Sequence, residues 1–391
     1  MNPIKQIQSA DRLQQVSEYY FSKKLKEIAD MNKRGADVIN LGIGSPTLPP
    51  SDESIDELCN SARNPENHSY QSYSGIPELR RAFADWYRDY FHVNLDAERE
   101  IQPLIGSKEG ILHISLAFLN PGDRVLVPNP GYPTYSSVTR LIGCEVVYYD
   151  LLESNHWYPD FEQLERMDLS NVKMIWVNYP HMPTGAKATK ELYREIVDFG
   201  KKHGILICND NPYSFILNDN PLSILEIPEA KTCCVELNSL SKSHNMAGWR
   251  MAMLASNAEF IQWILKVKSN IDSGQFKPMM LAAAKALHST EEWYGKLNES
   301  YGKQRIFAEE IMQILDCKFD PDQSGMFLWG KIPDYYPKAE DLCDKILYDA
   351  QVFITPGIVF GSNGEKYIRV SLSGGEEKLK SAIKRIKTVI Q

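Results

Sequence analysis

The stretch SLSKSHNMAGWRMA, residues 239–252, places a lysine and an arginine between two segments that favour burial. Residues 233–237 (CCVEL) precede it, and residues 251–255 (MAMLA) overlap its end and continue beyond it. Both segments have the composition of buried strands. A lysine among apolar groups has a lowered pKa, and its neutral amine is a nucleophile toward aldehydes. Arg250 keeps its charge and offers a fork of donors suited to phosphate. The stretch therefore predicts a site for a phosphate-bearing aldehyde at Lys242; the competing interpretation is a surface loop with an incidental lysine.

The composition is that of an ordinary globular protein: 391 residues, 43% hydrophobic and 24% charged, with a formal net charge of −8. This length suggests two or more compact units, or one large unit with a smaller lobe. The chain has neither a long basic run nor an apolar stretch near the roughly 20 residues that span a bilayer. We therefore expect no nucleic-acid or membrane partner.

The N-terminal segment and the cysteines indicate a cytoplasmic location. The first residues, MNPIKQIQSADRLQQ, lack the apolar run of a signal peptide. The seven cysteines are scattered and suit a reducing compartment. The eight histidines show no metal-ligand spacing such as HExxH, so we expect no metal site.

Strands and helices alternate between residues 100 and 255. We expect strands at 124–127, 145–149, 173–178, 205–208 and 232–237, and the clearest helix at 190–203. This alternation predicts a mostly parallel sheet with helices on both faces. A long charged helix (291–315) then introduces mixed helices and strands, which indicates an α+β lobe. Near the N-terminus we expect one helix over Asp11–Lys33 and a short strand over Val38–Gly42.

Polar side chains stand where three of these strands end. Asn178 ends one strand, Asp210 ends the next, and Ser239 with Lys242 follows a third. In open parallel sheets, ligands bind at the carboxyl ends of the strands. The sequence therefore predicts that an amide, a carboxylate and an amine meet in one site.

The stretch SLSKSHNMAGWR resembles the S-[LF]-S-K-x(5-6)-G-x-R signature of class I/II aminotransferases, the fold-type I pyridoxal-phosphate-dependent enzymes. Further motifs in matching order extend the resemblance from Asn40 to Ser373. It implies an α/β fold with a mostly parallel seven-stranded sheet sandwiched by helices, plus a smaller α+β domain. Residues 1–48 would belong to the small domain, residues 49–290 would form the large cofactor-binding domain, and residues 291–391 the small C-terminal domain.

The resemblance also implies an activity. Pyridoxal 5'-phosphate would be the cofactor, held by Lys242 as a Schiff base (an aldimine). An amino group would pass by a ping-pong mechanism from an L-amino acid to a 2-oxo acid, commonly 2-oxoglutarate in the family. Elimination from an amino acid on the same fold stays open, because it would use the same lysine, aspartate and arginine. A cofactor-binding regulatory module and a catalytically weakened relic are further alternatives.

The motifs assign roles to individual residues. NDNPY resembles the family's D-x-x-Y: Asp210 would pair with the pyridine nitrogen, and Tyr213 would hydrogen-bond the ring's phenolic oxygen. With Lys242 these are the expected catalytic residues. In LIGSKEG a helix N-terminus would receive the phosphate, and in NPGYPTY a tyrosine would stack on the ring. The remaining cofactor-binding positions implied are Gly106, Ser107, Lys108, Tyr132, Asn178, Ser239, Arg250 and Tyr70.

Three other segments resemble parts of the family that bind substrate or the second subunit. In YIRVSLS, Arg369 would grip the substrate α-carboxylate, and in LGIGSP, Gly44 would close over it. In YQSYSGIPELR, Tyr70 would reach the phosphate of the neighbouring subunit, which implies a homodimer.

One position departs from the family pattern. NYPHMPTG aligns with N-x-P-x-N-P-T-G, so Met182 stands where an asparagine usually contacts the phenolic oxygen. A thioether cannot donate that hydrogen bond. We therefore expect the pKa of the Lys242–cofactor linkage to be higher than in relatives with asparagine.

Overall fold

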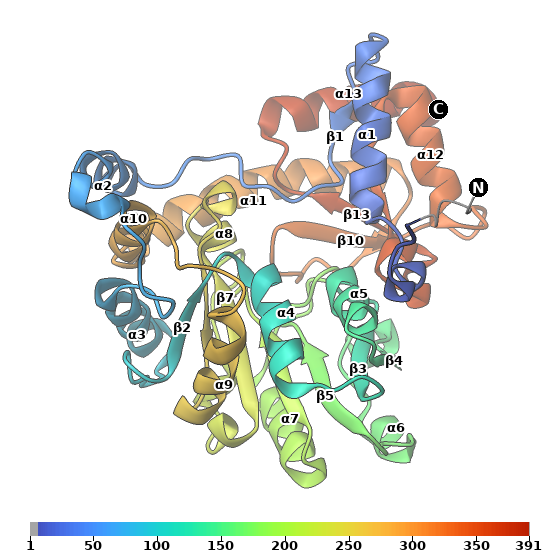
Figure 1. Ribbon diagram of the computed structural model, residues 1–391. Coiled ribbons are helices and arrows are strands. Elements are labelled where there is room, and N and C mark those ends of the chain that lie inside the picture. The colour runs from blue at the N-terminus through green and yellow to red at the C-terminus, as the bar shows by residue number, and fades with distance from the viewer. Residues whose placement is uncertain (1–6, 391) are drawn as a thin grey trace, which may run out of the picture.

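The computed structural model describes residues 7–390 and has a seven-stranded sheet in its large layered part (Figure 1). In spatial order its strands are β2 (Ile101–Leu104), β8 (Ala252–Ala255), β7 (Cys234–Ser239), β6 (Leu206–Asp210), β5 (Val172–Val177), β3 (Arg124–Asn129) and β4 (Glu145–Asp150). Strand β8 runs opposite to the other six strands. The predicted mostly parallel seven-stranded sheet is confirmed.

The alternation of side chains along the strands explains why helices cover both faces of this sheet. Met174 and Trp176 of β5 pack into one apolar cluster, whereas Ile175 and Val177 pack into another. The first cluster lies under α4 (Ser107–Phe118), α5 (Pro133–Leu141) and α9 (Ala258–Lys268). The second lies under α3 (Pro77–Phe91), α7 (Lys190–His203) and α10 (Lys277–Leu287), and α2 (Asp52–Ala62) packs on α10.

Helix α7 shows how local chemistry sets the bounds of an element. The Thr189 hydroxyl accepts a hydrogen bond from the N–H of Leu192 and caps the first turn. Gly204 ends the helix in the left-handed conformation, with φ of 64°. The bounds Lys190–His203 are those that the sequence predicts.

The first and last parts of the chain meet in a second group of elements beside the large sheet (Figure 1). Strands β12 (Thr355–Pro356), β13 (Tyr367–Ser371), β10 (Phe327–Lys331) and β9 (Lys318–Phe319) form an antiparallel sheet. Strand β1 (Ile39–Asn40) pairs in parallel with β11 (Val352–Phe353). Helices α1 (Tyr20–Lys33), α11 (Glu291–Ile314), α12 (Ala339–Ala350) and α13 (Glu376–Ile390) complete this part.

The single N-terminal helix expected over Asp11–Lys33 is wrong. A short 3-10 helix covers Asp11–Gln15, the chain then extends, and α1 begins at Tyr20. Tyr19 has extended backbone angles, with φ of −53° and ψ of 129°. Its ring leaves the helix and packs 4.6 Å from the Lys108 ammonium. This tertiary contact, which helical periodicity does not reveal, accompanies the break.

Within residues 7–390, no helix combines the length and the apolar composition needed to cross a membrane.

Candidate functional site

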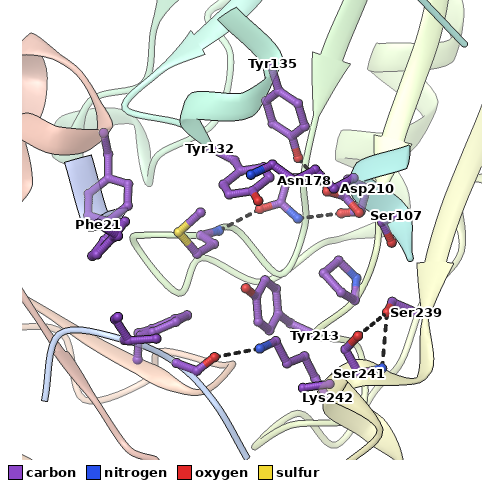
Figure 2. Close-up of a pocket in the computed structure, with 18 of the residues that line it drawn as sticks. Phe21, Ser107, Tyr132, Tyr135, Asn178, Asp210, Tyr213, Ser239, Ser241 and Lys242 are labelled. Atoms are coloured by element: carbon purple, nitrogen blue, oxygen red, sulfur yellow. Dashed lines mark hydrogen bonds between the residues drawn. The ribbon is translucent and has the colours of Figure 1, made fainter. Parts of the chain in front are cut away.

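A cavity of about 300 Å³ opens at the carboxyl ends of the parallel strands, between the large sheet and the second group of elements (Figure 2). All the predicted site residues except Gly106 and Tyr70 line it: Gly44, Ser107, Lys108, Tyr132, Asn178, Asp210, Tyr213, Ser239, Lys242, Arg250 and Arg369. Residues separated by hundreds of positions thus meet in one place.

Lys242 projects into the cavity from the short helix α8 (Leu240–Ser243), directly after β7. Its Nζ donates a hydrogen bond to the carbonyl oxygen of Gly44 at 2.7 Å (Figure 2). Burial, followed by the charges of Arg369 and Arg250, lowers the pKa of Lys242 to about 8. About a tenth of the amine is therefore neutral at pH 7, far more than for an ordinary lysine, and the neutral form is the one that a nucleophile or a general base requires.

Asp210 ends β6 and lies deep in the cavity wall. Its Oδ2 accepts a hydrogen bond from the Tyr135 hydroxyl at 2.8 Å, and the Asn178 amide donates to its backbone carbonyl (Figure 2). The buried Oδ1 receives no hydrogen bond within the described chain. Burial raises the pKa of Asp210 to about 7. An unpaired buried carboxylate oxygen of this kind suits a cationic N–H donor on a ligand.

Donors suited to an anion gather around the start of α4. Gly106 caps this helix with φ of 82°, and the buried Ser107 hydroxyl has no partner within residues 7–390. A Cβ on Gly106 would lie 2.0 Å from a terminal guanidinium nitrogen of Arg250, so the turn and the arginine are in close contact. The Ser239 hydroxyl donates a hydrogen bond to the Ser241 hydroxyl at 2.8 Å, and both serines line the cavity with Arg250. A helix N-terminus beside a guanidinium favours a phosphate.

Arg369 on β13 is buried among groups that do not neutralise its charge. It donates to the carbonyl oxygen of Gly42 at 2.7 Å and to the Met182 sulfur at 3.1 Å. Its guanidinium carbon lies 3.8 Å from the centre of the Phe327 ring and 4.5 Å from that of Phe360. Burial lowers the pKa of Arg369 to about 10. A buried guanidinium with these partners suits a ligand carboxylate.

Two tyrosines predicted to contact the cofactor lie in the cavity wall. Burial raises the pKa of both Tyr213 and Tyr132 above the ordinary tyrosine value, so both hydroxyls stay protonated and can donate hydrogen bonds. Figure 2 shows Tyr213 beside Lys242 and Tyr132 beside Asn178. Tyr70 is 90% exposed and does not line the cavity of its own chain.

The sequence reasoning missed several residues of this cavity: Tyr19, Phe21, Tyr135 and Phe360. The Tyr135 ring stacks on Trp176 at 4.7 Å between centroids, which aims its hydroxyl at Asp210. Its position three residues after Tyr132, at the start of a helix, is a weak signal that the two share a face. The three others come from segments whose sequences carry no chemical motif.

Residues 36–386 match the profile of the family described as Aminotransferase class I and II. The chain is 40% identical over 380 residues to the LL-diaminopimelate aminotransferase of Maridesulfovibrio salexigens, covering 96% of this chain and 98% of that protein. It is 38% identical over 382 residues to the LL-diaminopimelate aminotransferase of Aquifex aeolicus, covering 97% and 98%. Among solved structures, apo-BacF from Bacillus subtilis superposes with a TM-score of 0.94 at 33% identity, over 99% of both chains.

Proposed function

The chain belongs to the class I and II aminotransferase family and is a transaminase; we propose that it binds pyridoxal 5'-phosphate on Lys242 and uses it to move an amino group. One observation carries the proposal: the Lys242 amine and the unpaired oxygen of Asp210 open onto the same cavity. The two LL-diaminopimelate aminotransferases reported above are named for transamination, so this reaction is preferred over elimination.

The residues present fit this cofactor. The Asp210 oxygen would accept from the protonated ring nitrogen, and the start of α4 with Arg250 would hold the phosphate. Tyr132 would lie against the ring and Tyr213 would donate to its phenolic oxygen. When bound, the cofactor supplies an electron-withdrawing ring that weakens the Cα–H bond of the amino acid.

The protein side chains would orient the amino acid and move its proton. Arg369 would bind the α-carboxylate and so fix which bond at Cα faces the ring. With its pKa near 8, Lys242 would take the proton from Cα and deliver it to C4′, the carbon of the cofactor aldehyde. The enclosing rings of Phe327 and Phe360 would exclude water while the proton moves.

The substrate is proposed on two grounds. Both relatives are named for LL-diaminopimelate, which makes this diamino acid the first candidate donor. An aromatic L-amino acid is the second, because the rings of Phe21, Phe327 and Phe360 surround the Arg369 guanidinium. The relatives' names do not mention 2-oxoglutarate, so the acceptor is proposed only as a 2-oxo acid. Mass spectrometry of the keto acids formed from LL-diaminopimelate and from L-phenylalanine, offered at equal concentration, decides between the donors.

Assembly, domains and location form further parts of the proposal. The exposure of Tyr70 supports a homodimer in which it serves the neighbouring site. The pairing of β1 with β11 supports a small domain built from residues 1–48 and 291–391, beside a large domain of residues 49–290. None of the seven cysteines, all within the described chain, forms a disulfide, which supports a reducing, cytoplasmic compartment.

Covalent trapping tests the proposed function. Borohydride reduction of the cofactor-loaded protein, followed by peptide mapping, is expected to find the label on Lys242. The Lys242→Ala variant should keep the wild-type circular dichroism and lose transamination by at least about a thousandfold. A label on another lysine, or turnover by this variant at a rate near that of wild type, would reject the assignment. Ammonia formed without a 2-oxo acid acceptor would indicate elimination instead.

A further inference from the structure

A group of titratable side chains surrounds the buried Lys268 next to the turn that begins α4. Lys268, the last residue of α9, is only 1% exposed. Its Nζ lies 3.2 Å from Glu109 Oε1 and also contacts the Asp272 carboxylate. Burial, with the nearby Lys268 charge, lowers the pKa of His113 to about 4, so this neighbour of Glu109 is neutral. The buried lysine therefore supplies the positive charge that the two half-buried carboxylates of Glu109 and Asp272 need.

Three side chains of this group could ligate a metal ion, but the Lys268 ammonium occupies the position between the two carboxylates. Glu109, His113 and Asp272 each offer a ligand atom within 4.8 Å of the others. The Lys268 ammonium contacts both carboxylates, so a metal ion would have to displace it. We therefore regard the group as a salt-bridge network built around the lysine.

Each carboxylate of this network also holds a backbone N–H of a loop. The second oxygen of Glu109 accepts from the N–H of Ile105, in the turn that begins α4. Asp272 Oδ1 accepts from the N–H of Gly274 at 3.0 Å. A Cβ on Gly274 would lie 2.6 Å from the carbonyl oxygen of Gln71, so this loop packs on the segment next to Tyr70. The lysine thus connects three segments that are distant in the sequence.

The turn held by Glu109 is the one that contacts Arg250. Gly106 follows Ile105 directly, and its Cα leaves no space for a side chain against the guanidinium. The relative placement of the turn and of Arg250 sets how many donors can reach one phosphate. Since the ring of the cofactor would be bound elsewhere, at Asp210, a displaced turn would weaken phosphate binding selectively.

Resting on the proposed function, we propose that Lys268 is a positioning residue: through Glu109 and Asp272 it holds the turn at Gly106 in register with Arg250 for the cofactor phosphate. Lys268 does not line the cavity. Its effect is therefore expected in the affinity for the phosphate and not in the affinity for the ring.

Binding of pyridoxal phosphate and of pyridoxal, which lacks the phosphate, separates these two affinities. Both are titrated by absorbance into the apoprotein of wild type, Lys268→Met and Lys266→Met. Lys266 is the matched control, because it lies on the same helix, carries the same charge and is exposed. Lys268→Met should weaken pyridoxal phosphate by about tenfold or more and pyridoxal by less than about twofold, whereas Lys266→Met should resemble wild type.

Other outcomes overturn the proposal. If Lys268→Met binds both compounds as wild type does, or binds both more weakly by the same factor, the lysine does not position the phosphate site. If Lys268→Met does not fold, Asp272→Asn serves in its place, because it keeps the shape and removes one charge; it should lower the same ratio by about threefold. A wild-type apoprotein that binds both compounds equally would reject the proposed function, and the proposal with it.

Discussion

The charge of the buried Asp210 carboxylate makes the stability of the ligand-free protein depend on pH. Its folded pKa of about 7 lies above the ordinary value of 3.8. The folded state therefore binds more protons than the unfolded state between these values, and stability falls as pH rises through that window. Asp210→Asn removes this dependence, so it should raise the stability of the apoprotein by about 2–3 kcal/mol more at pH 8 than at pH 5. Urea unfolding at the two pH values measures this, and an equal effect at both would contradict it.

Substitutions of Met182 test a different property, the pKa of the linkage between Lys242 and the bound cofactor. Its sulfur accepts from Arg369 and its backbone N–H donates to Asn178, so the side chain offers no donor to the phenolic oxygen. Met182→Asn would supply one and should lower, by about one pH unit, the pKa seen when the cofactor absorbance is titrated. Met182→Leu, which also lacks a donor, should titrate like wild type. A Met182→Asn value at or above that of wild type would dismiss this explanation.

The residues found from sequence motifs and those missed differ in how they reach the cavity. Asp210 ends β6 and Lys242 follows β7, and the ends of neighbouring parallel strands of one sheet lie side by side, so the meeting of these two residues could be predicted. Arg369 lies on β13 of the other sheet, and only the motif around it indicated a place in the site. Tyr19 and Phe360 arrive through packing between distant segments, which leaves no periodic or chemical signature in the sequence. Only the folded chain shows them.

At the scale of elements, the sheet was predictable because its strands alternate with helices and are bounded by caps and turns, as at Thr189 and Gly204. The single helix expected over Asp11–Lys33 was wrong because the helical pattern continues across a break in the chain, where Tyr19 makes a tertiary contact with Lys108. The turn before α4 contacts Arg250, and a pair of glycine variants can test whether it sets the position of that guanidinium.

Gly106 and Gly122 share a positive φ but differ in surroundings. Their φ values are 82° and 92°; a Cβ on Gly106 would strike Arg250, whereas one on Gly122 would meet open space. Both alanine variants should lose about 1–2 kcal/mol of stability from backbone strain. Only Gly106→Ala should also weaken pyridoxal phosphate binding, by at least about tenfold, since it displaces the guanidinium. Equal affinities of the two variants for the cofactor would show that the turn does not set the position of Arg250.

At the scale of the whole molecule, the cavity of a single chain is lined by the groups proposed to hold the ring, the phosphate and the carboxylate, yet Tyr70 lies outside it and is exposed. A second copy of the chain would explain this position, because a residue that contributes to the neighbouring subunit's site is exposed on its own subunit. The expectation can be tested by complementation, in which two inactive variants restore each other only if they contribute to one shared site.

The variants are Lys242→Ala, which lacks the nucleophile, and Tyr70→Ala, which should lose about tenfold in cofactor affinity. They are unfolded together, refolded as a mixture and assayed at a cofactor concentration that leaves Tyr70→Ala mostly empty. In a mixed dimer, the site with Lys242 would receive Tyr70 from the other chain, so about a quarter of all sites should regain wild-type affinity and turnover. If Tyr70 served its own chain, no site in the mixture would hold both residues, and activity would stay at the sum of the two separate variants. Sedimentation at the assay concentration provides the control, because complementation requires that the mixture contain dimers.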